Sequence, residues 1–251
     1  MSRIVSHTQK AAAGAKRIFD ILDHVSSVPE PINPAPLGPV QGRITMHGVG
    51  FRYGNRAVSK GIDLEIAPGE MIGLVGHSGS GKSTLVNLIC RFYDVSSGSI
   101  ALDGRDIRSI GIADYRKRIG LVLQEPFLFF GTIAENISLG YPPQDFSNQE
   151  YWDCLERAEL ADFIKNLPEQ LSTQAGSRGT RLSGGQKQRI GIARAIFTKP
   201  KLIFMDEPTS ALDGETEAII SGNLRKMHGK TTLIMIAHRL STIKNFDKIV
   251  Y

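Results

Sequence analysis

The first apolar pattern in the chain has the spacing of a helix. Ala11, Ala15, Ile18 and Leu22 recur at intervals of three and four residues, so they share one helical face. This spacing predicts a helix over His7–Val25. The pattern leaves open whether the helix packs on the main body of the protein or belongs to something outside it.

A proline-rich stretch comes directly after this helix. Residues 26–42 hold five of the twelve prolines of the chain. Proline lacks a backbone N–H and fixes its own φ angle, so this composition predicts an extended linker. Because a stiff linker follows the helix, we favour the interpretation that the helix belongs to something outside the main domain.

From Gly42 onward the pattern becomes that of strands. Apolar residues alternate with polar ones up to Ile66, and Pro68-Gly69 then predicts a turn. Short continuous apolar runs predict buried strands at Met71–Val75, Ile119–Leu123, Leu202–Met205 and Thr231–Ala237. A helix is predicted over residues 148–167. Buried strands that alternate with helices indicate an α/β fold with a mainly parallel sheet covered on both faces.

Composition narrows the function classes. The 251 residues, 41% of them hydrophobic, suit one large domain or a domain with a subdomain, and the net charge of +5 fits a polyanionic ligand. No long basic run supports nucleic acid, so we expect no nucleic-acid partner. Cys90 and Cys154 lie in apolar or amphipathic contexts and read as buried thiols. Without an 18-residue apolar span or a signal peptide, we expect a soluble, cytoplasmic domain.

One segment has the pattern G-x-x-x-x-G-K-[ST] of a phosphate-binding loop. It follows a predicted buried strand and precedes a predicted helix, the context that such a loop requires. Lys82 would place a charge near the terminal phosphates, and the Ser83 hydroxyl would ligate Mg²⁺. A plain glycine-rich turn before a helix is the structural alternative. The candidate nucleotide-binding residues are Gly76, His77, Ser78, Gly79, Ser80, Gly81, Lys82, Ser83 and Thr84.

Two acidic residues follow the predicted strand at Leu202–Met205. Ligands of open parallel sheets bind at the carboxyl ends of the strands, so Asp206 would hold the Mg²⁺ shell. Glu207 would activate or orient the attacking water. Gln124, which interrupts an apolar run, would contact Mg²⁺ or water, or simply end a strand. His238 would donate to the γ-phosphate, although a lone histidine is more often a satisfied core or surface residue.

A second glycine-rich segment, Ser183-Gly184-Gly185-Gln186, opens a predicted helix that runs through Ile196. Ser183 and Gln186 have the spacing of a capping box. Two glycines in a first turn weaken a helix, which favours a close approach of bare backbone to an anion over a simple helix start. Tyr53, at the end of an apolar strand, would stack on an adenine or serve as a core tyrosine.

Together these segments resemble the nucleotide-binding domain of ABC transporters, over about residues 42–251. The Leu182–Gln186 segment matches the family signature in full, and Ser210–Asp213 stands in the family's order and spacing. The resemblance implies a P-loop NTPase (RecA-like) core, an N-terminal antiparallel β subdomain and an α-helical signature subdomain at about 125–195. It also implies ATP and Mg²⁺ as ligands.

The resemblance further implies a head-to-tail dimer with a second nucleotide-binding domain, either a homodimer or a heterodimer. Each ATP would lie between the phosphate loop of one copy and the signature of the other. Ser183 and Gly185 would touch the γ-phosphate of the other copy's ATP, and Asp213 would cross the dimer interface.

Residues 1–41 resemble the end of the last membrane helix of an exporter and its linker, around Arg17–Leu22. The run Gln124–Phe130 also resembles exporters, where this region meets the transmembrane domain. These likenesses imply an ATPase that powers export or flipping at the cytoplasmic face of a membrane, which we expect to be a bacterial plasma membrane. The chain ends at Tyr251, short of the family's usual last elements, so we expect a C-terminally truncated domain.

Gln174 and Ser177 stand where exporters usually carry acidic residues, so no role is assigned to their loop. Two other function classes stay open at this point. A non-transport ATPase of the same superfamily, acting on DNA or ribosomes, usually carries long coiled-coil insertions or tandem domains, and none appears in this sequence. A regulatory module that binds nucleotide without turnover would not need Glu207 and His238.

Overall fold

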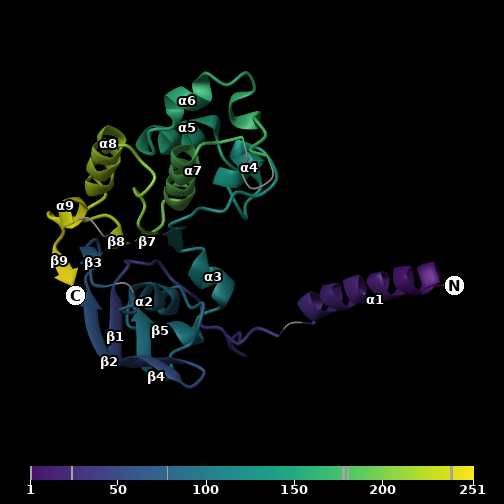
Figure 1. The fold of residues 1–251 in the computed structure, drawn as a ribbon. Helices are drawn as coiled ribbons and strands as arrows, with labels where there is room; N and C mark the ends of the chain where they lie inside the picture. Colours follow the sequence, from purple (N-terminus) through teal and green to yellow (C-terminus); the bar gives the residue numbers. More distant parts are fainter. Residues whose placement is uncertain (1, 24, 78, 177–178, 180, 238–239) are drawn as a thin grey trace.

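The computed structural model describes residues 2–23, 25–77, 79–176, 179, 181–237 and 240–251. Two β-sheets and their helices form one body, and helix α1 (Ser2–Leu22) extends away from it (Figure 1). The helix begins earlier and ends earlier than the predicted His7–Val25. Residues 7–22 are all exposed, so the structure does not show a helix packed on the body.

The proline-rich stretch has no helix or strand, as predicted, but it is strapped onto the body. The guanidinium of Arg91, which is 1% exposed, donates from Nη2 to the carbonyl oxygen of Pro29 at 2.9 Å. The Asp103 carboxylate accepts from the backbone N–H of Arg43 at 2.8 Å. We call residues 26–43 the strap, because bonds along it hold it to the surface of the body.

One of the two sheets is antiparallel, with strand order β2-β1-β4-β5. Its strands are β1 (Ile44–Tyr53), β2 (Arg56–Ile66), β4 (Ser97–Leu102) and β5 (Arg105–Asp106). The alternating pattern arises because one face is buried: Ile44, Met46 and Ile66 are at most 1% exposed. Between β1 and β2 the chain reverses through a two-residue turn, Gly54-Asn55.

The second sheet is parallel, with strand order β6-β7-β8-β3-β9. Its strands are β3 (Met71–Leu74), β6 (Ile119–Val122), β7 (Leu202–Asp206), β8 (Thr232–Ile236) and β9 (Lys248–Val250). The four apolar runs of the sequence are therefore four of these strands. The predicted mainly parallel sheet is confirmed.

The remaining elements cover the sheets. The α-helices are α2 (Lys82–Ile89), α3 (Ile112–Arg116), α4 (Ile133–Ile137), α5 (Asn148–Arg157), α6 (Ala161–Lys165), α7 (Gly184–Phe197), α8 (Gly214–Arg225) and α9 (Leu240–Ile243). Short 3₁₀ helices span Ile107–Ser109, Pro143–Asp145 and Gln170–Ser172. The helix predicted over residues 148–167 is two helices, because Glu159 has φ +54° and breaks it.

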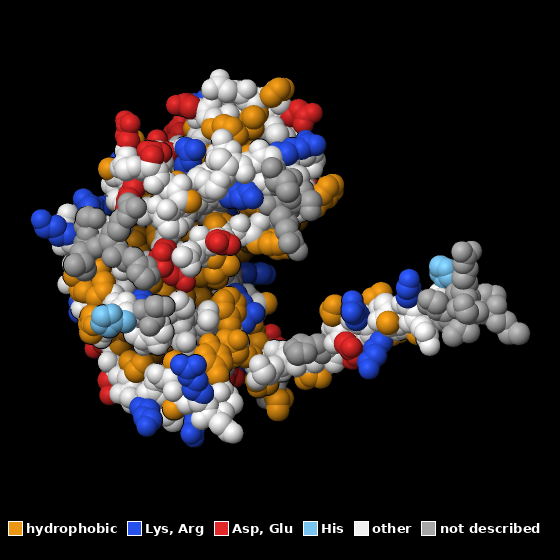
Figure 2. All heavy atoms as spheres, viewed as in Figure 1, with side chains coloured by type: hydrophobic (Ala, Val, Ile, Leu, Met, Phe, Trp, Pro, Cys, Tyr) orange, Lys and Arg blue, Asp and Glu red, His pale blue; other side chains and the backbone are white. Residues whose placement is uncertain are grey.

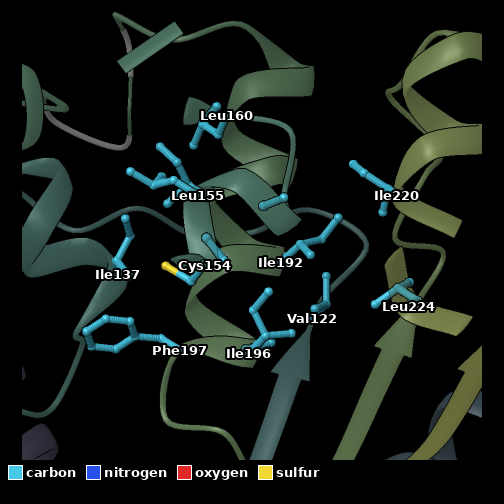
Figure 3. Packing of buried hydrophobic residues seen from close by; sticks show 14 of the residues in the cluster. Val122, Ile137, Cys154, Leu155, Leu160, Ile192, Ile196, Phe197, Ile220 and Leu224 are labelled. Atoms are coloured by element: carbon cyan, nitrogen blue, oxygen red, sulfur yellow. The ribbon is translucent and has the colours of Figure 1, made fainter. Parts of the chain in front are cut away.

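The parallel sheet separates two hydrophobic cores. Along β7, Leu202 and Phe204 face one core, whereas Ile203 and Met205 face the other, as the two-residue period of a strand requires. The first core joins the sheet to α2 and the antiparallel sheet. The second joins it to α5, α7 and α8, where Ile192 and other α7 side chains lie above the strands (Figure 3).

Candidate nucleotide-binding site

The predicted phosphate loop connects β3 to α2. Gly76, Gly79 and Gly81 have φ angles of +143°, +80° and +98°, a region that L-residues rarely adopt. Gly81 is the N-cap of α2, and it has no side chain that could accept from the first turn. The N–H groups at the start of α2 therefore keep their capacity for an anionic ligand, and the helix dipole adds partial positive charge there.

The loop wraps around the side chain of Lys82. Its Nζ atom donates to the carbonyl oxygens of Gly76 at 2.7 Å and His77 at 3.0 Å, and lies 3.4 Å from Ser80 Oγ. These contacts place the ammonium group at the centre of the loop. A phosphate that enters the loop therefore meets this charge directly.

The acidic pair lies opposite the loop. Asp206 ends β7, and its Oδ2 atom is 3.4 Å from Ser83 Oγ. Glu207 follows in the left-handed region with φ +47°, and its backbone N–H donates to Ile236 O at 3.0 Å. Gln124 Nε2 donates to Glu207 Oε2 at 3.3 Å. The end of β6, the end of β7 and the start of α2 thus converge at one sheet edge.

A cavity of about 460 Å³ brings these groups together. Its lining contains nine of the predicted site residues. Sequence reasoning missed Arg56, Val58 and Ile236. A signal for Arg56 was present, since Tyr53 and Arg56 flank the turn of the first hairpin and face each other across it. The lining residues are Tyr53, Arg56, Val58, Gly79, Gly81, Lys82, Ser83, Thr84, Gln124, Asp206, Glu207 and Ile236.

Tyr53 lies at the edge of the cavity, within a cluster of aromatic side chains. Its ring packs edge-on against Phe51 at 4.7 Å and Tyr93 at 5.2 Å between centroids. It is nevertheless 39% exposed and lines the cavity. The ring is thus held by an aromatic cluster, and part of the residue remains exposed at the cavity.

The second glycine-rich segment begins α7 and does not line this cavity. Ser183 Oγ accepts from the Gln186 N–H at 3.2 Å, and Gln186 Oε1 accepts from the Ser183 N–H at 2.9 Å, so the predicted capping box is present. A Cβ atom on Gly185 would lie 3.2 Å from Ala211 O, whereas one on Gly184 would meet only ordinary contact. Close packing in this chain therefore explains the second glycine but not the first.

Two of the predicted site residues, Ser78 and His238, lie outside the described residues. Asp213 is the N-cap of α8, and its side chain accepts from the Thr216 N–H at 2.9 Å. This bond and a second one from the Thr216 hydroxyl hold the pKa of Asp213 below its usual value.

The oxygen atoms at the site fit a magnesium ion that is bound together with phosphates. Within the described residues, no three His, Cys, Asp or Glu side chains come together as a metal site. Ser83 and Asp206 supply a hydroxyl and a carboxylate oxygen side by side. Mg²⁺ typically takes one or two such protein ligands and completes its shell with substrate phosphates and water.

Comparison with known proteins agrees with this geometry. A family model described as "ABC transporter" matches residues 59–210. The chain belongs to the ABC transporter family. It carries the ATP-binding and ATPase domain of that family, with the P-loop NTPase fold, an antiparallel β subdomain and a parallel sheet.

Relatives within the ABC transporter family include exporters and flippases. The chain is 43% identical over 251 residues to an ATP-dependent lipid A-core flippase of Syntrophus aciditrophicus (strain SB), covering all of this chain and 41% of that protein. It is 44% identical over 259 residues to Multidrug resistance protein 1 of Entamoeba histolytica, covering 99% and 20%. The chain thus spans less than half the length of these relatives.

A solved structure of a bacterial Atm1-family ABC exporter with ATP bound has a similar fold. The TM-score is 0.86 at 37% sequence identity, and the match covers 96% of this chain and 42% of that one. In the described part of the chain, no helix combines the length and the apolar character that crossing a membrane would require.

Proposed function

We propose that this chain binds ATP with Mg²⁺ in the cavity and hydrolyses it, and that this reaction powers export or flipping of a substrate across a membrane. The observation that carries the proposal is the cavity itself. It joins the phosphate loop, the Ser83–Asp206 pair and the Gln124–Glu207 pair at one sheet edge.

Each side chain has a role in this proposal. Lys82 turns from the loop carbonyls to the terminal phosphates, and Tyr53 stacks on the adenine. Mg²⁺, bound by Ser83, Asp206 and Gln124, would neutralise charge on the phosphates. Glu207 orients the attacking water or takes its proton, with Gln124 hydrogen-bonded to its carboxylate.

The other predicted site residues belong to the same proposal. His238 would donate to the γ-phosphate. The backbone of Gly76–Thr84, with Ser78, His77 and Ser80 in it, would surround the phosphates. A second nucleotide-binding domain, a copy of this chain or a related one, would close the cavity head to tail with its own Ser183, Gly184, Gly185 and Gln186. The capped start of α7 lies outside this chain's cavity, which is the placement that such a dimer needs.

An apolar groove supports a transmembrane domain as the other partner. A cavity of about 520 Å³ runs between α3, α4 and α7, and an indentation with hydrophobic side chains is visible on the side of the body that faces α1 (Figure 2). Phe127 and Phe129 line it and are half exposed. Arg194 donates to Phe127 O at 3.0 Å and so fixes this rim. We place the domain at the cytoplasmic face of a membrane, in bacteria the plasma membrane, with residues 1–41 as the connection to the membrane domain.

Substitution of Glu207 tests the catalytic part. In a phosphate-release assay, Glu207→Gln should lower kcat on the order of 10²–10⁴-fold, because the amide cannot accept a proton from water. ATP binding should persist, since the phosphate loop is unchanged, and light scattering should show a dimer with Mg²⁺ and ATP. Glu156→Gln, an exposed acid on α5, is the matched control and should keep wild-type turnover. Wild-type turnover by Glu207→Gln would remove Glu207 from the mechanism.

A further inference from the structure

A buried glutamine on α7 contacts the loop that holds Glu207. Gln188 is 1% exposed, and its side-chain amide makes three contacts with residues 207–211. Its Nε2 atom donates to Glu207 O at 2.9 Å and lies 3.3 Å from Ser210 Oγ. Its Oε1 atom accepts from the Ala211 N–H at 2.8 Å. One side chain thus forms hydrogen bonds with both ends of this loop, at Glu207 and at Ala211.

The loop needs such support because its first residue is strained. Glu207 has φ +47°, which is unfavourable for a residue with a Cβ atom and persists only when the surroundings fix it. The backbone N–H of Glu207 is held by Ile236 O at 3.0 Å, on one side of the residue. Gln188 holds its carbonyl oxygen on the other side. The peptide units on both sides of the strained residue are therefore fixed.

Glutamine is chemically suited to this position. The loop presents a carbonyl oxygen at Glu207 and an N–H at Ala211, so the partner must donate and accept at the same time. A glutamate of the same shape lacks the donor, and a methionine lacks both groups. Because Gln188 is buried, water cannot replace the lost bonds without opening the packing between α7 and the loop.

We propose that Gln188 is a positioning residue for ATP hydrolysis. It holds Glu207 in the backbone conformation that directs the carboxylate toward Gln124 and the cavity. It also joins this loop to α7, whose N-cap is Ser183, so that a displacement of α7 reaches the Glu207 loop of the same chain. The inference rests on the proposed function, in which Glu207 acts on the attacking water.

The test uses the full chain with Gln188→Met, which keeps the length of the side chain and removes both hydrogen-bonding groups. We expect kcat for phosphate release to fall on the order of 10- to 100-fold, since small displacements of a catalytic group have effects of this size. The KM for ATP should stay within about twofold of wild type, because the phosphate loop is unchanged. The control is Asn223→Asp on α8. It alters a half-buried amide that donates to Arg157 O at the end of α5, and it should keep wild-type kcat.

A double-mutant cycle separates positioning from simple loss of structure. In a Glu207→Gln background, Gln188→Met should lower the residual kcat less than about twofold, because there is no longer a working carboxylate to position. An equal loss in both backgrounds, or wild-type kcat in the single variant, would overturn the inference.

The remaining outcomes are also decisive. If Gln188→Met does not give a folded chain by circular dichroism, Gln188→Glu takes its place, since it keeps the shape and the acceptor for Ala211. If neither variant folds, Gln188 serves stability alone and the inference fails. If wild type releases no phosphate, or Glu207→Gln matches it, the proposed function has failed instead.

Discussion

The two glycine-rich helix starts of this molecule differ in how their N–H groups are satisfied. At α2 the N-cap is Gly81, which offers no side chain, and the loop before it bends around Lys82. At α7 the N-cap is Ser183, which forms a reciprocal capping box with Gln186. The first helix start lines a cavity, and the second lies outside it.

This difference distinguishes a nucleotide-binding site from what we call the docking edge, the start of α7 at Ser183–Gln186 that the proposed dimer places against the second copy. The start of α2 leaves its N–H groups for a ligand held by the same chain, whereas α7 is already capped and needs no ligand to form its first turn. Its exposed Ser183 and Gly184 are therefore available to a group that approaches from outside the chain. In the proposed dimer, that group is the triphosphate bound to the α2 start of the second copy.

The largest expected effect comes from mixing two inactive variants. Lys82→Met removes the charge of the phosphate loop, and Ser183→Arg blocks the exposed start of α7, so each variant alone should lose turnover. In a head-to-tail dimer of one copy of each, one site contains both substitutions. The other site is formed by an unchanged phosphate loop and an unchanged α7 start. An equimolar mixture should therefore recover about a quarter of wild-type phosphate release, if the copies pair at random and the sites act independently.

Two controls sharpen this experiment. Either variant mixed with itself at doubled concentration should stay inactive. A mixture of Lys82→Met with Glu207→Gln should also stay inactive. Both residues lie on the phosphate-loop side of the site, so every site in every dimer carries one of the two substitutions. No recovery in the first mixture, with both variants folded and dimeric, would mean that the two helix starts do not share one nucleotide.

A smaller effect is expected on the rates at which the two buried thiols are labelled, because each thiol lies in a different core. Cys90 ends α2 in one core, and Cys154 is a buried residue of α5 in the other. Burial raises the pKa of each thiol to about 12, so at pH 8 only about 10⁻⁴ of either is thiolate. Labelling by a disulfide reagent should therefore be slow until the surrounding core opens.

Nucleotide should separate the two labelling rates. ATP at about 100 times its Kd stabilises the bound form by about 2.7 kcal/mol, so labelling of Cys90 should slow by up to about 100-fold. Cys154 should slow less, because its core does not contain the helix that starts in the cavity. Equal slowing at both thiols, measured by mass spectrometry of the labelled peptides, would show that the two cores open as one unit.

Much of this molecule could be predicted from local sequence signals. The apolar runs place the strands of the parallel sheet, and the Ser183–Gln186 spacing predicts a capping box that the structure confirms. These features depend on residues that are close in sequence. Alternation and capping leave a pattern within a few positions, so no knowledge of the tertiary structure is needed.

The features that could not be predicted depend on distant contacts. Glu159 and Glu207 adopt positive φ angles without being glycine, so composition gives no sign of the breaks they make. Arg91 is a charged residue that is fully buried, because its guanidinium donates to Asp94, to Ile110 O and to Pro29 O of the strap, 62 positions away. Gln188 resembles an ordinary polar position of an amphipathic helix until the loop at residues 207–211 is placed against it.

The smallest effect comes from adding one methyl group at each helix start. Gly81→Ala places a Cβ atom at φ +98°, which should lower the free energy of unfolding by about 1–3 kcal/mol and weaken ATP binding in the same chain. At Gly184 the backbone is ordinary and the added Cβ would lie 3.8 Å from Ala211 Cβ. There alanine should raise the free energy of unfolding, by a few tenths to about 1 kcal/mol, because it forms helix better than glycine.

The Gly184→Ala variant then sets stability against turnover. If bare backbone at α7 must approach a triphosphate on the second copy, the more stable variant should have lower kcat and form less ATP-dependent dimer, with ATP binding to the monomer unchanged. Thermal melts, light scattering and phosphate release on one preparation measure all three. A Gly184→Ala chain that is more stable and equally active would mean that nothing approaches α7 closely at this residue, and the docking edge would then have to be carried by Ser183 and Gly185 alone.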